Sequence, residues 1–226
     1  PYDSFNLGRH IKDEQLRKDA LDNREKLCQA LYLSFARMKI PGQVHSKTVV
    51  IVEDQKAYAS LDQVDGLSTA LLEVPLLLHF ADCVPVMVFE RKKRIAAIFH
   101  AGWRGTAQGI VSHGIEIMAR RFSIEPRDMV AAVGPAIGSC CYPTDQNVAN
   151  SLKQSVKDDR GLIEIREGRP CPDLKGFNAM QLLEAGIEAI DVSDSCTACN
   201  PDVFYSHRQS GGITGRQGAL ICLESV

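Results

Sequence analysis

Apolar and polar residues follow two different periods along the chain. Between residues 12 and 38, apolar positions recur every three or four residues, with charged residues between them. These positions are Leu16, Ala20, Leu21, Leu27, Ala30, Leu31 and Phe35. Because this spacing puts them on one face, the pattern predicts an amphipathic helix that Pro41 and Gly42 terminate.

Short apolar and β-branched runs bounded by turn residues predict strands in the rest of the chain. They cover residues 47–52, 74–80, 84–89, 94–99, 129–133, 190–192, 203–207 and 219–223. Helical periodicity predicts further helices at residues 106–121, 145–157 and 178–187. Strands both follow each other directly and alternate with helices. We therefore expect an α+β fold with mixed or antiparallel sheets covered by helices.

Size and composition indicate one large domain. The chain has 226 residues, of which 45% are hydrophobic, and no linker rich in Pro, Gly or Ser divides it. A core of that size is sufficient for one unit, so we expect a single domain over residues 1–226. The chain begins with Pro1 rather than Met, and we expect a further N-terminal segment before it.

Charge and hydropathy restrict the partners. The 26 basic and 28 acidic residues are interspersed and give a net charge of -2, so no basic stripe for nucleic acid is formed. Apolar runs stay below the roughly 18 residues of a membrane span, and the start lacks a signal-peptide pattern. We expect a cytoplasmic protein with neither nucleic-acid nor membrane partners. Its eight cysteines then predict buried thiols or metal ligands.

Two candidate functional residues lie at equal distances from a charged turn. Cys83 and His100 flank the turn at Arg91 and Lys92, with an apolar run on each side. If the runs form an antiparallel hairpin around that turn, Cys83 pairs directly with His100, with Cβ atoms about 4.5 to 5.5 Å apart. Such a pair can ligate zinc or act as a Cys–His nucleophile pair, and both chemistries remain open at this point.

A third candidate ligand is His45, in a loop that leads into a predicted strand. With Cys83 and His100 it would form a His2Cys set that leaves one coordination position for water or substrate, which is typical of catalytic zinc. The alternative is that each of the three is an ordinary core or loop residue.

Basic residues near this set suggest anion binding. Arg104 lies in the segment GWRG (102–105) directly before a predicted helix, where backbone N–H groups and a guanidinium can bind an anion. A tight turn with a surface arginine is the alternative. His207, Arg208 and Arg216 lie in a polar C-terminal stretch, and we favour their lining a pocket over facing solvent.

The remaining cysteine motifs give weaker signals. Cys196 and Cys199 have zinc-ribbon spacing, but no second CxxC accompanies them, so a four-ligand site is weakly supported. The adjacent Cys140 and Cys141 suggest burial rather than redox chemistry. The sequence contains no GxSxG, HExxH, P-loop or GxGxxG motif and no deaminase HxE with PCxxC, which disfavours the enzyme classes that depend on them.

Several short segments together resemble the laccase-domain (YfiH-like) family, also labelled multicopper polyphenol oxidoreductase. The matching segments are QVH (43–45), DG (65–66), ADCVP (81–85), HAGWRG (100–105), GPAIG (134–138), CY (141–142), SHR (206–208) and TGR (214–216). The resemblance covers about residues 6–220, and the ADC and HAGWRG segments are specific when they occur together.

The resemblance implies a layered α/β/β/α arrangement and zinc bound by His45, Cys83 and His100. It also implies phosphorolysis of adenosine, inosine and methylthioadenosine to base and (methylthio)ribose 1-phosphate, with adenosine deamination as a further activity. Purine nucleosides and phosphate would be the partners. Copper is less favoured, because a multicopper oxidase needs about ten histidines and this chain has six with no HxH pair.

Three hypotheses follow for the same residues. The first is a zinc-dependent nucleoside enzyme in which Cys83, His100 and Arg104 are catalytic and His207, Arg208 and Arg216 bind substrate. The second is a metal-free hydrolase or amidase in which Cys83 attacks and His100 is the base. The third is a non-catalytic protein that binds a nucleoside in the same pocket. Polyphenol oxidation by copper, as the older label implies, is the least favoured.

Overall fold

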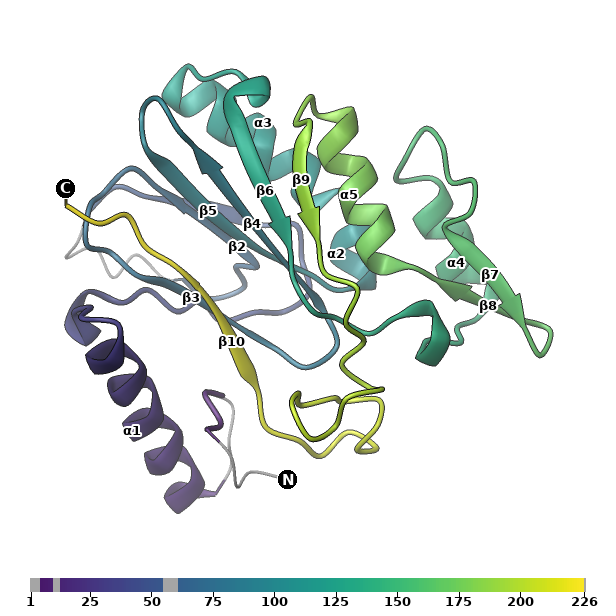
Figure 1. Cartoon of the computed structure of the whole chain (residues 1–226), viewed down its shortest axis with the longest axis horizontal. Coiled ribbons are helices and arrows are strands. Elements are labelled where there is room, and N and C mark those ends of the chain that lie inside the picture. The colour runs from purple at the N-terminus through teal and green to yellow at the C-terminus, as the bar shows by residue number, and fades with distance from the viewer. Residues whose placement is uncertain (1–4, 10–12, 55–60, 226) are drawn as a thin grey trace.

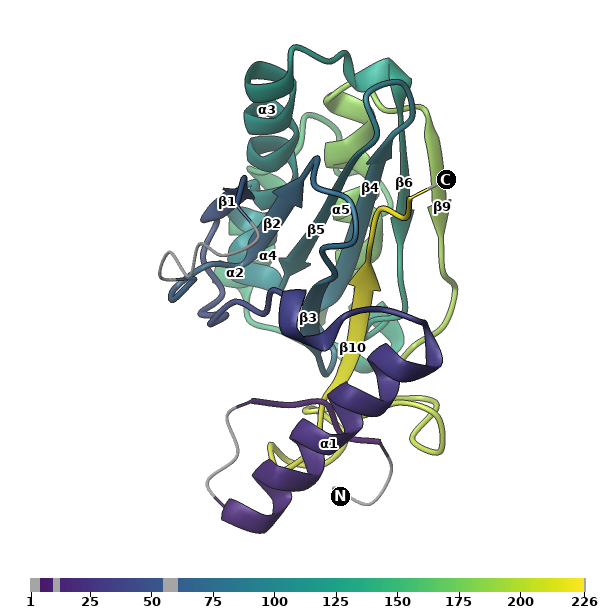
Figure 2. The ribbon, with the colours of Figure 1, turned by 90° about the vertical axis from the view of Figure 1, so that its left-hand side faces the viewer.

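The computed structural model describes residues 5–9, 13–54 and 61–225 and is built around a six-stranded mixed sheet. Its strand order is β1 (Val49–Val52), β2 (Gly66–Thr69), β5 (Ile95–Ala101), β4 (Val84–Glu90), β6 (Met129–Val133) and β9 (Ala189–Val192). The outer pairs β1–β2 and β6–β9 are parallel, and the inner pairs are antiparallel (Figures 1 and 2).

Different layers cover the two faces of this sheet. Helices α2 (Trp103–Ala107), α3 (Ile110–Phe122) and α5 (Leu174–Glu184) lie on one face, and the pair β3 (Leu76–Phe80) with β10 (Gln217–Ile221) lies on the other (Figures 1 and 2). Helix α1 (Glu14–Ala30) lies beside the β3–β10 pair, away from the other helices (Figure 2). Helix α4 (Gln146–Lys153) and the hairpin β7 (Ile163–Arg166) with β8 (Arg169–Pro172) complete the fold.

The alternation of side chains along the central strands explains why both faces are covered. On β4, Val86 and Val88 pack with the helices, whereas Met87 packs toward β3 and β10. On β5, Phe99 belongs to the helix side and Ile98 to the other. Successive strand residues point to opposite faces, so a strand apolar at every position must be buried on both sides. The structure thus confirms the α+β fold.

Several predicted elements differ from the structure, and the helices predicted at 145–157 and 178–187 are observed at Gln146–Lys153 and Leu174–Glu184. The helix predicted at 12–38 ends with Ala30, because Tyr32 adopts a left-handed φ of 55°, and a separate short helical turn follows at Phe35–Arg37. The helix predicted at 106–121 is two helices, α2 and α3, separated at Gly109 with φ 72°. The strand predicted at 203–207 is wrong, because that segment forms turns. The sequence pattern also missed β2, β7 and β8.

The register predicted for the β4–β5 hairpin is wrong by two residues. His100 pairs with Pro85, not with Cys83, because the turn uses four residues rather than two. The buried Glu90 carboxylate accepts hydrogen bonds from the backbone N–H groups of Lys92 and Lys93, which widens the turn. A shift of two positions keeps every side chain on its face, whereas a shift of one would reverse them. Cys83 therefore still lies on the same side as His100.

In the part of the chain that the structure describes, no helix combines the length and the apolar character needed to cross a membrane.

Candidate active site

A cavity of about 630 Å³ gathers every residue that the sequence predicted for the site. Its walls come from the N-terminal segment, the loop before β1, the turn before β4, the end of β5, helix α2 and the loop before β10. The predicted residues that line it are His45, Cys83, His100, Arg104, His207, Arg208 and Arg216. Its volume is typical of sites for small organic ligands.

His45, Cys83 and His100 form a compact group of possible metal ligands. Their ligand atoms all lie within 4.8 Å of one another, and the two imidazole rings meet edge to face with centroids 4.8 Å apart. His100 is buried near the end of β5, Cys83 is half-buried directly before β4, and His45 is exposed in a loop with a left-handed φ of 64°. Three separate segments of the chain therefore bring two imidazoles and one thiol together at the wall of the cavity.

The buried carboxylate of Asp65, for which the sequence pattern predicts no role, organises this group. It accepts hydrogen bonds from the backbone N–H groups of Val44, His45 and Ser46, and its Oδ1 lies 2.8 Å from Nδ1 of His100. The side chain is fully buried. Asp65 thus fixes the loop that carries His45 and orients His100, with its Nδ1–H toward the carboxylate and Nε2 available as a ligand.

The pKa of each of the three side chains His100, Cys83 and Asp65 is shifted in the direction that favours its charged form. Burial alone would lower the pKa of His100, but the neighbouring Cys83 and the hydrogen bond to Asp65 raise it to about 9. Burial alone would raise the pKa of Cys83, but His100 and His45 lower it to about 6. Although burial also opposes the charge of Asp65, its hydrogen bonds to His100 and Ser46 lower its pKa to about 2. The surroundings therefore favour a thiolate at Cys83.

Gly102 leaves the space that the group needs. A Cβ atom at this position would lie 2.9 Å from Sγ of Cys83 and 2.9 Å from Cδ2 of His45, closer than real Cβ contacts. The same residue caps the start of α2, so the helix that carries Arg104 begins directly against the ligand group. Any side chain at position 102 would displace two of the three possible ligands.

Arginine side chains supply positive charge on another wall of the cavity. The guanidinium of Arg104 lies over the Trp103 ring at 4.5 Å, and that of Arg208 lies over the Tyr142 ring at 5.0 Å. Nη1 of Arg216 donates to the backbone carbonyls of Thr214 and Gly215, so this side chain is bound to its own loop. Nη1 of Arg208 donates a single such bond, to the carbonyl of Pro143 at 3.2 Å, so Arg104 and Arg208 are better placed than Arg216 to meet an anion in the cavity.

Asp82 positions the Arg208 loop rather than the ligand group. Its Oδ2 accepts from the backbone N–H of Arg208 at 2.7 Å, and its Oδ1 accepts from the Thr197 hydroxyl at 2.7 Å. The backbone of Asp82 also has a φ of 88°, which turns the chain immediately before Cys83. The carboxylate therefore fixes the C-terminal loop over the cavity.

Known proteins resemble this chain over nearly its whole length. The family model described as multi-copper polyphenol oxidoreductase laccase matches residues 1–224. A protein named purine nucleoside phosphorylase YlmD from Geobacillus stearothermophilus is 38% identical, covering 98% of this chain and 84% of its own length. One named adenosine deaminase RL5, from an unknown prokaryotic organism, is 30% identical, covering 95% of this chain and 85% of its own length.

A solved structure agrees with the fold. The crystal structure of YlmD from Geobacillus stearothermophilus superimposes with a TM-score of 0.93 at 37% identity, covering all of this chain and 87% of that one. Together with the match of the family model, this shows that the chain belongs to the multi-copper polyphenol oxidoreductase laccase family, whose relatives include proteins named as nucleoside enzymes.

Proposed function

We propose that this protein is a zinc-dependent purine nucleoside phosphorylase that also deaminates adenosine. Its substrates would be adenosine, inosine and methylthioadenosine, which it would convert with phosphate to the free base and (methylthio)ribose 1-phosphate. The observation that carries the proposal is the convergence of a His2Cys group and two arginines on one cavity whose volume suits a small organic ligand. The names of the relatives support the same substrate class.

The donor set fits zinc. Two imidazole nitrogens and one thiolate within 4.8 Å of each other match the ligand types of catalytic zinc sites, and the cavity leaves the remaining side open. His45, Cys83 and His100 would hold the ion, and Asp65 would keep the proton of His100 on Nδ1. Zinc in such a site acts as a Lewis acid and lowers the pKa of bound water toward 7.

The arginines would bind the phosphate. In phosphorolysis an oxygen of hydrogen phosphate forms a bond to the anomeric carbon while the bond from that carbon to the base nitrogen breaks. The electron pair of the broken bond stays on the base nitrogen, and the base takes up the proton that the phosphate loses. Arg104 and Arg208 would hold the phosphate at the correct face of the ribose and keep it oriented through charge-assisted hydrogen bonds. We assign His207 and Arg216 to the wall that contacts the nucleoside.

Product analysis tests this proposal directly. Purified protein is incubated with adenosine, inosine or methylthioadenosine, with and without phosphate, and bases, sugar phosphates and ammonia are quantified. We expect a free base and a sugar phosphate only when phosphate is present, and inosine from adenosine without it. Absence of all these products from protein whose zinc content has been verified would contradict the proposal.

The position of Cys83 between two imidazoles also suits the second hypothesis, a metal-free Cys–His hydrolase. The two functions respond differently to inhibitors. Removal of zinc by a chelator abolishes a zinc-dependent activity and leaves a metal-free one intact. Full activity after verified zinc removal, combined with irreversible loss on thiol alkylation, would favour the hydrolase.

A further inference from the structure

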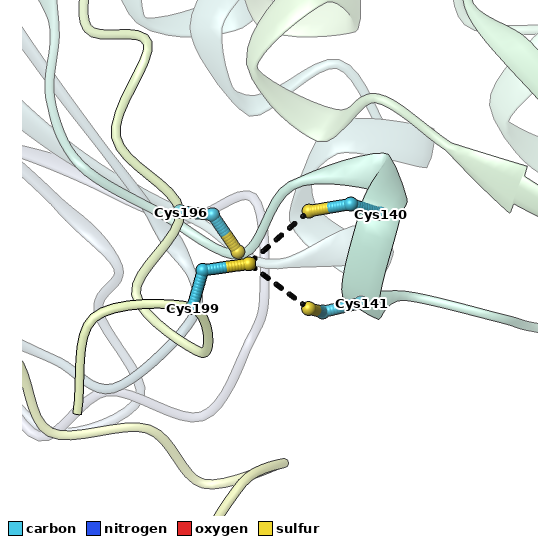
Figure 3. Close-up of side chains that lie close together, drawn as sticks. All are labelled: Cys140, Cys141, Cys196 and Cys199. Atoms are coloured by element: carbon cyan, nitrogen blue, oxygen red, sulfur yellow. Dashed lines mark hydrogen bonds between the residues drawn. The ribbon is translucent and has the colours of Figure 1, made fainter.

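A second group of possible metal ligands lies outside the cavity and consists of four cysteines. Cys140 and Cys141 belong to the short helical turn Ser139–Cys141, and Cys196 and Cys199 follow β9, so two segments far apart in sequence meet here (Figure 3). The burial expected for Cys140 and Cys141 is wrong, because Cys140 is exposed and Cys141 only half-buried. The sequence shows no second cysteine pair near the CxxC motif, but the fold brings Cys140 and Cys141 next to Cys196 and Cys199.

The sulfur spacing suits one tetrahedral ion. All four Sγ atoms lie within 4.8 Å of one another, and Sγ of Cys199 is 3.6 Å from that of Cys140 and 3.3 Å from that of Cys141. Zinc with four sulfurs at about 2.3 Å places neighbouring sulfurs about 3.8 Å apart. A disulfide instead needs two sulfurs at about 2.05 Å, and all four cysteines are free.

The backbone around the cysteines supports thiolate ligands. The N–H of Gly138 donates to Sγ of Cys196 at 3.2 Å, and the Asn200 side chain closes the CxxC turn by donating to the carbonyl of Cys196 at 2.8 Å. A Cβ atom at position 138 would lie 3.1 Å from Sγ of Cys140, so glycine permits the close approach of the two segments. Four thiolates this close repel each other unless a cation lies among them.

We propose that Cys140, Cys141, Cys196 and Cys199 bind one zinc ion in a closed, structural site. Zinc is the ion that four thiolates with this spacing favour. The site would fasten the loop that follows β6 to the segment that follows β9. The neighbouring residues Tyr142 and Thr197 connect those segments to the cavity, since Tyr142 lines it and Thr197 binds Asp82. The role of this zinc is therefore to hold two walls of the active site in place.

Elemental analysis of the purified, reduced and desalted protein tests the proposal. We expect two zinc ions per chain in the wild type and one in the Cys140→Ser/Cys199→Ser variant. The matched control is Cys222→Ser, which removes a cysteine outside both ligand groups and should retain two. If the double variant does not fold, X-ray absorption of the His45→Ala/Cys83→Ala variant should still show zinc with four sulfurs at about 2.3 Å.

Two results would overturn the proposal. One is a wild-type protein in which, after reduction and incubation with zinc, all four cysteines react with an alkylating agent as fast as in the presence of a chelator. The other is a zinc absorption spectrum of the His45→Ala/Cys83→Ala variant without a four-sulfur component. Failure of nucleoside turnover would leave both measurements unaffected, so the structural site and the proposed function can be refuted separately.

Discussion

The His45–Cys83–His100 group and the four-cysteine group are both compact, but their surroundings differ. In each, all ligand atoms lie within 4.8 Å of one another. The first combines nitrogen with sulfur and faces a cavity of about 630 Å³, whereas the second offers only sulfur and lies between two loops near the surface. Three ligands beside open space suit catalysis, and four ligands that enclose an ion suit structure.

The groups also differ in what lies behind their ligands. A fully buried carboxylate, Asp65, orients His100 and the His45 loop, whereas a backbone N–H from Gly138 faces the sulfur of Cys196. A carboxylate hydrogen-bonded to a ligating histidine adjusts the basicity of that imidazole, whereas a backbone N–H that donates to a sulfur only stabilises the thiolate. The comparison indicates that fine adjustment of the ligands is concentrated at the group that faces the cavity.

The largest effect is expected from removing the thiolate of Cys83 from the His45–Cys83–His100 group. Cys83→Ala should reduce inosine phosphorolysis by at least about 100-fold, because even partners behind a ligand change activity by 10- to 100-fold. Zinc per chain should fall by one. Activity and zinc content are measured together, with Cys222→Ala as the control that retains both. Unchanged phosphorolysis in Cys83→Ala would remove the distinction between the two groups.

A somewhat smaller effect is expected at the carboxylate behind His100. Asp65→Asn keeps the shape of the side chain but removes the charge that orients the imidazole. We expect zinc affinity and turnover to fall by about 10- to 100-fold. Competition with a chelator measures the affinity, and circular dichroism verifies folding. A folded Asp65→Asn protein with wild-type zinc affinity would show that Asp65 serves only to hold the loop at His45.

The sequence predicted the members of the cavity better than their arrangement. Strand alternation predicted that Cys83 and His100 lie on one face. This prediction is correct although the register is wrong, because the register differs by an even number of positions. The width of the turn depends on Glu90, whose side chain caps two backbone N–H groups. Periodicity does not contain such a side-chain contact, so the register could not be obtained from it.

Contacts between distant segments were the part that the sequence could not supply. Asp65 is 35 residues from His100, and Cys141 is 58 from Cys199, so neither pairing leaves a local pattern. The DG segment containing Asp65 was visible only as part of the family resemblance. The CxxC motif was visible but incomplete, because its second pair comes from adjacent cysteines without zinc-ribbon spacing.

The arginine wall should contribute less than the ligand group. Arg104→Ala should raise the KM for phosphate about tenfold, which corresponds to one charge-assisted hydrogen bond of about 1.5 kcal/mol. The KM for nucleoside should change less. Arg120→Ala is the matched control, since Arg120 lies on the exposed side of α3 and pairs with Glu116. Equal phosphate KM values for Arg104→Ala and Arg120→Ala would exclude Arg104 from phosphate binding.

The smallest effect is expected at the hydrogen bond that joins the two regions. Thr197→Val keeps the size of the side chain and removes the hydroxyl that donates to Asp82. Losing this bond should lower the free energy of unfolding by about 1.5 kcal/mol and the Tm by roughly 3 to 6 °C. Because Asp82 also binds the backbone of Arg208, the KM for phosphate should rise by about two- to threefold, less than a single lost contact to the anion.

Thr69→Val distinguishes this connection from a general loss of stability. The Thr69 hydroxyl is buried and donates to the carbonyl of Val52 in the sheet, away from both ligand groups. The same oxygen accepts from the backbone N–H of Leu71 at 3.0 Å, so removing the hydroxyl should lower the Tm by at least as much without changing the KM for phosphate. If both variants change KM equally, or if neither does, Asp82 does not transmit the position of the four-cysteine group to Arg208. The two regions would then be independent sites in one fold.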